Sequence, residues 1–269
     1  MSACTEVIFY SIDFVPQRFN NSLLNNIFHT LEIYCVKKSD YVWNVSPRIA
    51  EGRKKILHIS DKQYKQIVVP IGVWNHKVKK RNFNQIKKHQ ILFLGHLLEK
   101  QGVKLVLEAL PSIIRKIPDV HFIIAGGGEY LDTLQKTVDE LSLGKYVTFT
   151  GWITKRETID DMMSESALAI ATYKPEKEKL RNFTYYADPT KLKDYLSAGL
   201  PIILTDISYN AREIAEKKCG ILVEYDKEII AKSIIKLLTD NTLLAAYRKN
   251  AIQYAKDFDW SVIFDKLWD

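Results

Sequence analysis

The chain has 269 residues and a formal net charge of +7, with 46% hydrophobic and 26% charged residues. This composition is that of a globular protein, and the length allows one large or two modest domains. No uninterrupted apolar run approaches the roughly 18–20 residues of a membrane span, and the start lacks the basic-then-apolar pattern of a signal peptide. Three widely spaced cysteines, Cys4, Cys35 and Cys219, indicate neither a disulfide framework nor a metal cluster, so we expect a cytoplasmic protein.

The positive charge is concentrated in one segment. Six cations fall between residues 77 and 88 with no acid among them: Lys77, Lys79, Lys80, Arg81, Lys87 and Lys88. Such a run is either a solvated linker between domains or a contact for an anionic membrane surface, at about 1 kcal/mol per cation. Nucleic acid is not an expected partner, because the segment lacks a set of base-stacking aromatic residues.

The first 75 residues alternate between strand and helix patterns. Strands are expected at 7–12, 41–46 and 67–73, and helices at 23–38 and 47–55. Asp13 ends the first strand, where it is either a candidate catalytic acid or an N-cap. Because this alternation is short for a complete dinucleotide-binding unit, we predict a partial α/β domain over 1–75.

A second domain is expected over 90–257, after a basic linker at 76–89. Its apolar strands are expected at 91–95, 121–128 (ending in a glycine turn), 146–151, 167–172, 201–205 and 220–225. Its helices are expected at 103–117, 129–142, 155–164, 209–217, 226–239 and 242–257, with a polar loop at 173–187 and a tail helix at 258–269. Strands that alternate with helices predict a doubly wound parallel sheet whose site lies at the carboxyl edge.

A further helix is expected inside residues 185–206. Asp188 is a good N-cap, and Pro189 suits the first helical position, where the missing N–H costs nothing. Gly199 ends the helix and Pro201 prevents its resumption before a buried strand.

The start of this helix is a candidate phosphate site. At the carboxyl edge of a parallel sheet, its free N–H groups and positive dipole end would suit a diphosphate. Lys191 and Asp194 are three residues apart and so share a face near that end.

This stretch resembles the second-domain signature of GT-B glycosyltransferases, especially glycosyltransferase family 4. There, a helix with two glutamates eight positions apart precedes a Gly-x-Pro turn and a buried strand. Aligned on Gly199 and Pro201, the second glutamate falls on Asp194 and the first on Tyr186. The resemblance implies that Asp194 holds the ribose of a nucleotide-sugar donor, while loop and helix amides hold its phosphates. It extends over roughly 90–269 and is partial before residue 75, where the family's glycine-rich acceptor loop and its usual histidine have no counterpart.

The family's two diphosphate-binding cations are replaced in this chain. His96, after Gly95, stands where the family usually has an arginine, and Gln101 stands where it has a lysine. Since a departing diphosphate needs positive charge, Lys100, Lys191 and Arg18 are the substitutes that the sequence offers.

Other candidate donor contacts come from turns. The spacing of Gly126, Gly127 and Gly128 does not match a dinucleotide fingerprint, so they form either a tight turn or a turn that approaches the donor. Trp152 and Ile153 either pack or contact the donor base. The full candidate donor-binding set is Gly95, His96, Gly127, Gly128, Trp152, Ile153, Tyr186, Ala187, Asp188, Thr190, Lys191 and Asp194, and the candidate catalytic set is Asp13, Lys100 and Lys191.

The resemblance implies an α/β protein of GT-B type, with a tail helix that crosses back to the first domain. Its expected activity is transfer of a sugar from a nucleotide-diphosphate donor to a hydroxyl acceptor in glycan, glycolipid or polysaccharide biosynthesis. The reaction would retain anomeric configuration, with no metal and no cofactor besides the donor. The alternative is a nucleotide-sugar-binding subunit, or a truncated chain, that needs a partner chain to supply the rest of the first domain. A sugar epimerase is less consistent with the sequence, since its carboxylates and histidine cannot be placed.

Overall fold

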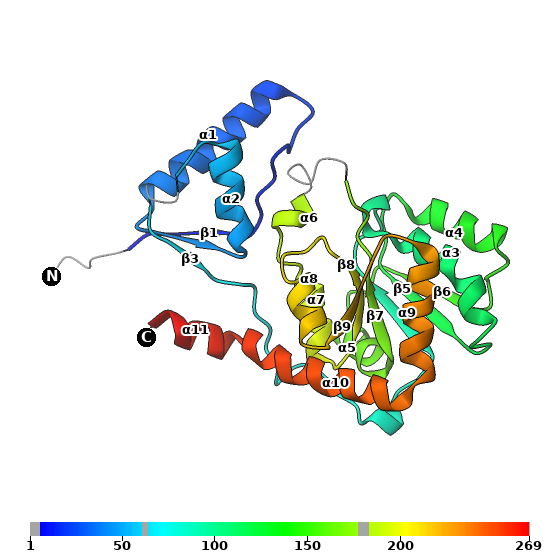
Figure 1. Cartoon of the computed structure of the whole chain (residues 1–269). Helices are drawn as coiled ribbons and strands as arrows, with labels where there is room; N and C mark the ends of the chain where they lie inside the picture. Colours follow the sequence, from blue (N-terminus) through cyan, green and yellow to red (C-terminus); the bar gives the residue numbers. More distant parts are fainter. Residues whose placement is uncertain (1–5, 61–63, 177–182, 269) are drawn as a thin grey trace. The chain divides into compact units, whose positions relative to one another are not determined.

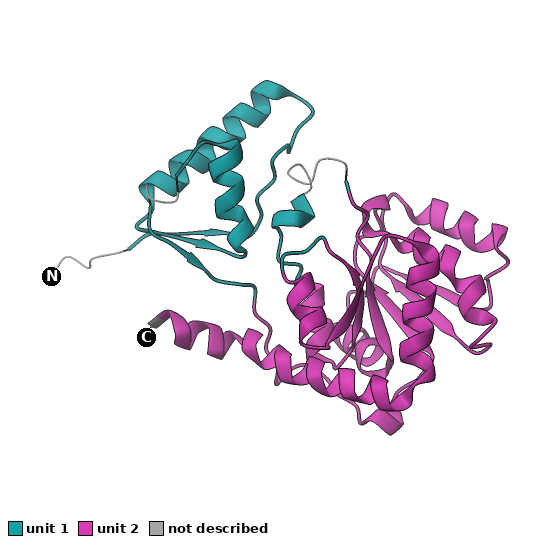
Figure 2. Ribbon diagram, viewed as in Figure 1, with its two compact units in different colours: residues 1–71, 176–189, 207–209 teal, residues 72–175, 190–206, 210–269 magenta. Residues whose placement is uncertain are grey.

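The computed structural model describes residues 6–60, 64–176 and 183–268 (Figure 1). The chain divides into two compact units (Figure 2). Unit 1 comprises residues 1–71, 176–189 and 207–209, and unit 2 comprises 72–175, 190–206 and 210–269. Two short segments that come late in the chain, 176–189 and 207–209, therefore belong to the first unit.

Unit 1 contains a parallel sheet, three-stranded in the described residues, in the order β1-β2-β3. Its strands are β1 (Ile8–Ser11), β2 (Tyr41–Asn44) and β3 (Gln66–Val68), and its helices are α1 (Ser22–Lys38), α2 (Pro47–Ile56) and α6 (Phe183–Tyr186). A buried ion pair joins the two longer helices, because Arg53 of α2 donates to Glu32 of α1 at 2.9 Å. Arg53 also donates to Asn44 of β2 at 2.6 Å, so one guanidinium fixes both helices against the sheet.

Unit 2 contains a parallel sheet, six-stranded over its described part, in the order β6-β5-β4-β7-β8-β9. The strands are β4 (Gln90–Leu94), β5 (His121–Ala125), β6 (Val147–Gly151), β7 (Leu168–Ala171), β8 (Ile202–Thr205) and β9 (Gly220–Val223). The α-helices are α3 (Val103–Ile114), α4 (Leu131–Glu140), α5 (Arg156–Glu165), α7 (Thr190–Ser197), α8 (Ala211–Glu216), α9 (Lys227–Thr239), α10 (Asn241–Ala255) and α11 (Trp260–Trp268). Short 3₁₀ helices are η2 (Phe83–Gln85), η3 (Glu99–Gln101) and η5 (Lys256–Phe258).

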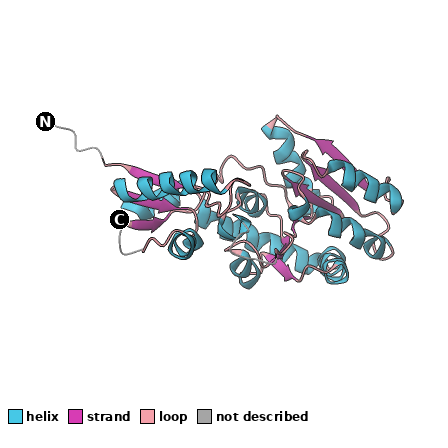
Figure 3. Ribbon diagram, turned by 90° about the horizontal axis from the view of Figure 1, so that it is seen from above, coloured by secondary structure: helices cyan, strands magenta, loops and turns pink. Residues whose placement is uncertain are grey.

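Helices cover both faces of this sheet. Figure 1 shows α3, α4 and α9 on one face and α5, α7, α8 and α10 on the other, and Figure 3 shows from above that helices lie on both sides of the strands. α3 packs on α9, and α7 packs on α10. The core on the first face includes Phe93, Val106, Ile113 and Ile234, all fully buried. Because strand order reverses direction between β4 and β7, a crevice opens at the carboxyl ends of the strands.

The predicted doubly wound parallel sheet is confirmed, and so is the predicted end of the helix at 190–197. Gly199 has a left-handed φ of +79°, and Leu200 N–H donates to the carbonyl of Tyr195 at 2.8 Å. This is the geometry in which glycine ends a helix at least cost.

Two predicted elements are wrong in extent. The strand expected at 67–73 ends at Val68, because Pro70 has no N–H to continue the ladder. The loop expected at 173–187 contains the short helix α6. The remaining predicted elements are present and differ only at their ends. Within the described residues, no helix combines the length and apolar character that crossing a bilayer requires.

Candidate functional site

A pocket of about 260 Å³ opens in unit 2, where β4, β5 and β6 end. It is lined by Leu94, Gly95, Ala125, Gly126, Trp152, Ile153, Arg156, Ile159, Lys191 and Asp194. The carboxyl ends of parallel strands are where open α/β sheets bind ligands. The structure thus brings together Gly95, Trp152, Ile153, Lys191 and Asp194 of the predicted donor-binding set.

Two glycines allow the turns after β4 and β5 to touch. Gly126 has φ +138°, and a Cβ there would lie 2.0 Å from the carbonyl oxygen of Gly95. A Cβ at Gly127 would lie 2.4 Å from the indole nitrogen of Trp152. The Trp152 ring in turn lies 5.6 Å from the ring of His96, between centroids. Glycine at these positions therefore permits close packing of the backbone beside the pocket, as a tight turn requires.

Lys191, in the first turn of α7, contributes an enclosed amine to the pocket. Its Nζ donates to Gln101 Oε1 at 2.7 Å and lies 4.5 Å from the centroid of the Phe93 ring. Burial among these neutral groups lowers the pKa of Lys191 to about 7. The amine lies beside residue 101, the position at which the resemblance places a lysine.

Asp194, one turn further along α7, is held by an arginine. Nη2 of Arg156 donates to Asp194 Oδ1 at 2.9 Å, and Nε of Arg156 donates to Asp160 Oδ1 at 2.9 Å. Burial raises the pKa of Asp194, and the Arg156 charge and hydrogen bond oppose this rise. The next residue, Tyr195, fixes α7 to β4, since its hydroxyl accepts the N–H of Leu94 at 2.7 Å.

The other predicted residues of unit 2 lie outside the pocket lining. His96, Gly127 and Gly128 form the adjacent turn, and a Cβ at Gly128 would lie 2.6 Å from the His96 ring. Thr190 is the exposed first residue of α7. Lys100 lies in η3, where its backbone carbonyl accepts the N–H of Lys174 at 2.9 Å.

Four predicted residues belong to unit 1. Asp13 is exposed just after β1. Tyr186 is fully buried, and its ring meets that of Phe14 edge-on with centroids 5.0 Å apart. Ala187 is buried, and the carboxylate of buried Asp188 accepts the N–H of Ile71 at 2.8 Å. In unit 1, Tyr186 and Asp188 thus have packing and hydrogen-bonding roles, and their contacts to a donor stay predictions.

Arg156 lines the pocket but is absent from the predicted set. It starts the helix that follows β6, only three residues after Ile153, and its position at the carboxyl edge was the signal that could have identified it. Three or more His, Cys, Asp or Glu side chains that could hold a metal are not found together among the described residues.

The basic segment 77–88 packs on α5 of the same unit. Lys79 forms an ion pair with Asp161, and Glu165 pairs with Arg81 at 2.7 Å and with Lys87 at 2.8 Å. These acids lie some eighty residues later in the chain. The positive charge of segment 77–88 therefore has acidic partners in the fold, although the segment itself contains no acid.

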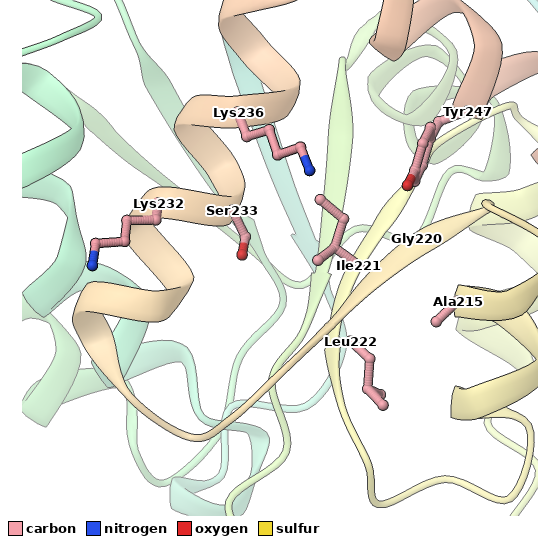
Figure 4. Close-up of a pocket in the computed structure, with 8 residues that line it drawn as sticks. All are labelled: Ala215, Gly220, Ile221, Leu222, Lys232, Ser233, Lys236 and Tyr247. Carbon is pink, nitrogen blue, oxygen red and sulfur yellow. The ribbon is translucent and has the colours of Figure 1, made fainter.

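A second hollow, of about 400 Å³, lies beside the edge strand β9 (Figure 4). Figure 4 shows Lys236 of α9 and Tyr247 of α10 on either side of Ile221, while Lys232 points away. Although this hollow is larger, its lysines are exposed and its lining includes Gly220, the first residue of β9. It is therefore away from the carboxyl edge, and the smaller pocket is the one that contains predicted donor-binding residues.

Known proteins resemble this chain in both sequence and fold. The family model "Glycosyl transferases group 1" matches residues 76–257. The chain is 24% identical over 181 residues to a GDP-mannose-dependent alpha-(1-6)-phosphatidylinositol monomannoside mannosyltransferase of Mycobacterium tuberculosis, covering 66% of this chain and 46% of the relative. It is 27% identical over 183 residues to a phosphatidyl-myo-inositol mannosyltransferase of Mycolicibacterium smegmatis, covering 64% and 42%. The chain thus spans about half the length of these curated relatives.

Solved structures show the same fold. The crystal structure of Anabaena HepE in complex with UDP superposes with a TM-score of 0.77 at 17% identity, covering 97% of this chain and 70% of HepE. A match at this identity shows the GT-B fold alone. The family match, in contrast, takes in the linker and the whole sheet of unit 2 with its pocket, and the chain belongs to the group 1 glycosyl transferases.

Proposed function

We propose that this chain acts in the transfer of a sugar from a nucleotide-diphosphate donor to a hydroxyl group of a glycan or lipid-linked acceptor. One observation carries the proposal. Lys191 and Asp194, from the first turns of one helix, line a pocket at the carboxyl edge of a parallel sheet. A cation and helix amides suit a diphosphate, and a carboxylate suits the hydroxyl groups of a ribose.

In this proposal the protein stabilises the leaving group and orients the two substrates. Lys191 and the first N–H groups of α7 receive the charge that develops on the diphosphate as the glycosidic bond breaks. Asp194 accepts hydrogen bonds from the ribose, and the turn at Trp152 and Ile153 contacts the base. Retention of configuration and independence from metal are parts of the proposal. The donor's base and sugar are left open, since the relatives are named for GDP-mannose and the HepE complex contains UDP.

A second candidate function is nucleotide-sugar binding without catalysis by this chain alone. The observation in its favour is that His96 and Gln101 stand at the two positions where the family has cations. Assays of donor hydrolysis and transfer separate the two functions. Binding without turnover, with turnover restored by a partner chain, would favour the second.

Contact with an anionic membrane surface through residues 77–88 is a further part of the proposal. The segment keeps exposed cations, since Lys87 remains 62% exposed although it pairs with Glu165. Binding to vesicles of anionic lipid, compared with neutral vesicles at the same salt, measures this contact. A cytoplasmic location at the inner face of the membrane is proposed with it.

Substitution of Asp194 by alanine tests the donor site. We expect Asp194→Ala to weaken binding of UDP or GDP by about tenfold or more, because a charge-assisted hydrogen bond is lost. Isothermal calorimetry measures the affinity, and thermal melting shows that the variant is folded. The matched control is Asp139→Ala on α4, which removes an exposed acid outside the pocket. Unchanged affinity in Asp194→Ala would remove this residue from the site.

A further inference from the structure

Arg156 has an unusual place in the pocket. It lines the cavity, and its guanidinium donates to two carboxylates at once, to Asp160 through Nε and to Asp194 through Nη2, each at 2.9 Å. The first partner is on the same helix, four residues on, whereas the second lies on α7 across the pocket. The guanidinium therefore joins the helix after β6 to the helix that precedes β8.

The environment of Asp194 determines how strongly this bridge affects its ionisation. The side chain of Asp194 is only 19% exposed, and the strand ends beside it supply Leu94, Gly95, Ala125 and Gly126, which carry no charge. The titratable groups around it are Arg156 and Asp160 of α5 together with Lys191 and Tyr195 of its own helix. Burial and the Asp160 charge favour the protonated acid, and Arg156 opposes them.

The chemistry of ribose binding requires the ionised form. A carboxylate only accepts hydrogen bonds, so it can take one from each of two neighbouring hydroxyl groups. A protonated carboxyl group has lost part of that capacity, and its neutral hydrogen bonds are weaker. The bridge also limits the rotamers of Asp194, so that less freedom is lost when a ligand binds.

We propose that Arg156 is a positioning residue that holds the Asp194 carboxylate ionised and aimed at the ribose hydroxyl groups of the donor. This inference rests on the proposed function, because it takes Asp194 as the ribose ligand. Arg156 acts through Asp194 and takes no part in bond breaking.

The test measures discrimination between ribose and deoxyribose. UDP, GDP and ADP are titrated into the wild-type protein, and the tightest of them is compared with its 2′-deoxy and 3′-deoxy forms. Because all forms carry the same diphosphate, the ratio of affinities removes the contribution of Lys191. In the wild type we expect the ribose form to bind more tightly than the deoxy forms. The ratio of the ribose affinity to the deoxyribose affinity should not change between pH 6 and pH 8.

Arg156→Gln is expected to lower this ratio, and to lower it more at pH 6 than at pH 8, because without the Arg156 charge and hydrogen bond the pKa of Asp194 rises further and a larger share of the acid is protonated at the lower pH. Arg156→Lys keeps a cation and should restore the level profile, although a lysine does not bridge two carboxylates bidentately. Asp160→Asn is the matched control. It removes the other partner of Arg156 and a negative charge, and it should leave the ratio unchanged.

The outcomes separate the two proposals. If no diphosphate binds to the wild type, or if Asp194→Ala retains the full ribose ratio, the proposed donor site is wrong. If the wild type discriminates and Asp194→Ala does not, while folded Arg156→Gln keeps the wild-type ratio and pH profile, then the inference about Arg156 is overturned and the donor site stands.

Discussion

At the scale of single residues, the pocket depends on how two side chains of α7 are charged. Lys191 is surrounded by Gln101, Phe93 and Tyr173, with its Nζ 4.9 Å from the Tyr173 ring centroid. None of these three groups is a carboxylate, so burial disfavours the ammonium form and lowers the pKa of Lys191 to about 7. A diphosphate beside this amine would favour the ammonium form, so its binding should be linked to uptake of a proton.

We therefore expect the affinity for UDP or GDP to be level below about pH 7 and to fall as the pH rises further, by up to about tenfold per pH unit. The terminal phosphate of the ligand has a second pKa of about 6, so it is ionised above pH 7, where the affinity is expected to fall. Calorimetry from pH 7 to 9 in two buffers of different ionisation enthalpy measures the protons taken up. Lys191→Gln should bind more weakly with a flat profile, and Lys104→Gln on α3 is the control. An equal slope in Lys191→Gln and wild type would contradict this assignment.

At the scale of elements, the junction between η3 and α3 holds the carboxyl edge together. Gly102 lies at this junction with φ +72°, and Thr172, after β7, donates its hydroxyl to the Gly102 carbonyl at 3.3 Å. A Cβ at Gly102 would lie 1.7 Å from the backbone oxygen of Thr172. The junction also carries Gln101, the partner of Lys191, so its backbone conformation supports the pocket.

Gly102→Ala should lower the free energy of unfolding by at least about 2 kcal/mol, because the new methyl group meets backbone and the left-handed φ is strained. Gly144→Ala is the matched control, since a Cβ there meets nothing within 4 Å. Urea unfolding followed by circular dichroism compares the two variants. Equal stability of both would show that the turn relaxes without cost.

At the scale of the whole molecule, the two units differ in how well their apolar surface is covered. Among the described residues, unit 2 contains an extensive core cluster, whereas unit 1 contains small clusters around Val45 and Val42. Most of the exposed large apolar side chains of the described chain are in unit 1, including Leu23, Ile27, Leu31 and Tyr34 of α1, each at least 50% exposed. A parallel sheet with little covering has less free energy of burial to stabilise it.

Hydrogen exchange of the native protein should therefore be faster in unit 1. We expect the backbone amides of β2, the central strand of unit 1, to exchange at least about tenfold faster than those of β4 and β5. Mass spectrometry of peptides from the two sheets measures the difference. Equal protection in both sheets would mean that they open as one cooperative unit.

The sequence by itself determined the local features of this protein. The continuous apolar runs predicted the strands of the second sheet, Gly199 and Pro201 predicted the end of α7, and spacing placed Lys191 and Asp194 on one face. Each of these follows from backbone preferences and periodicity over a few residues, which do not depend on distant parts of the chain. The family resemblance, with a tight turn or plain packing as the alternative, suggested that the glycine turn and Trp152 approach the donor, and the structure places Gly126 and Trp152 in the pocket lining.

Only the tertiary structure decided the partners of these residues. It placed Lys191 against Gln101, ninety positions away, and Asp194 against Arg156, thirty-eight positions away. It also put the Tyr186 ring into the core of unit 1 and paired the basic segment with acids of α5. These contacts depend on which strands are neighbours in the sheet and how the helices pack across it, and both are set by burial summed over the whole chain rather than by any local spacing.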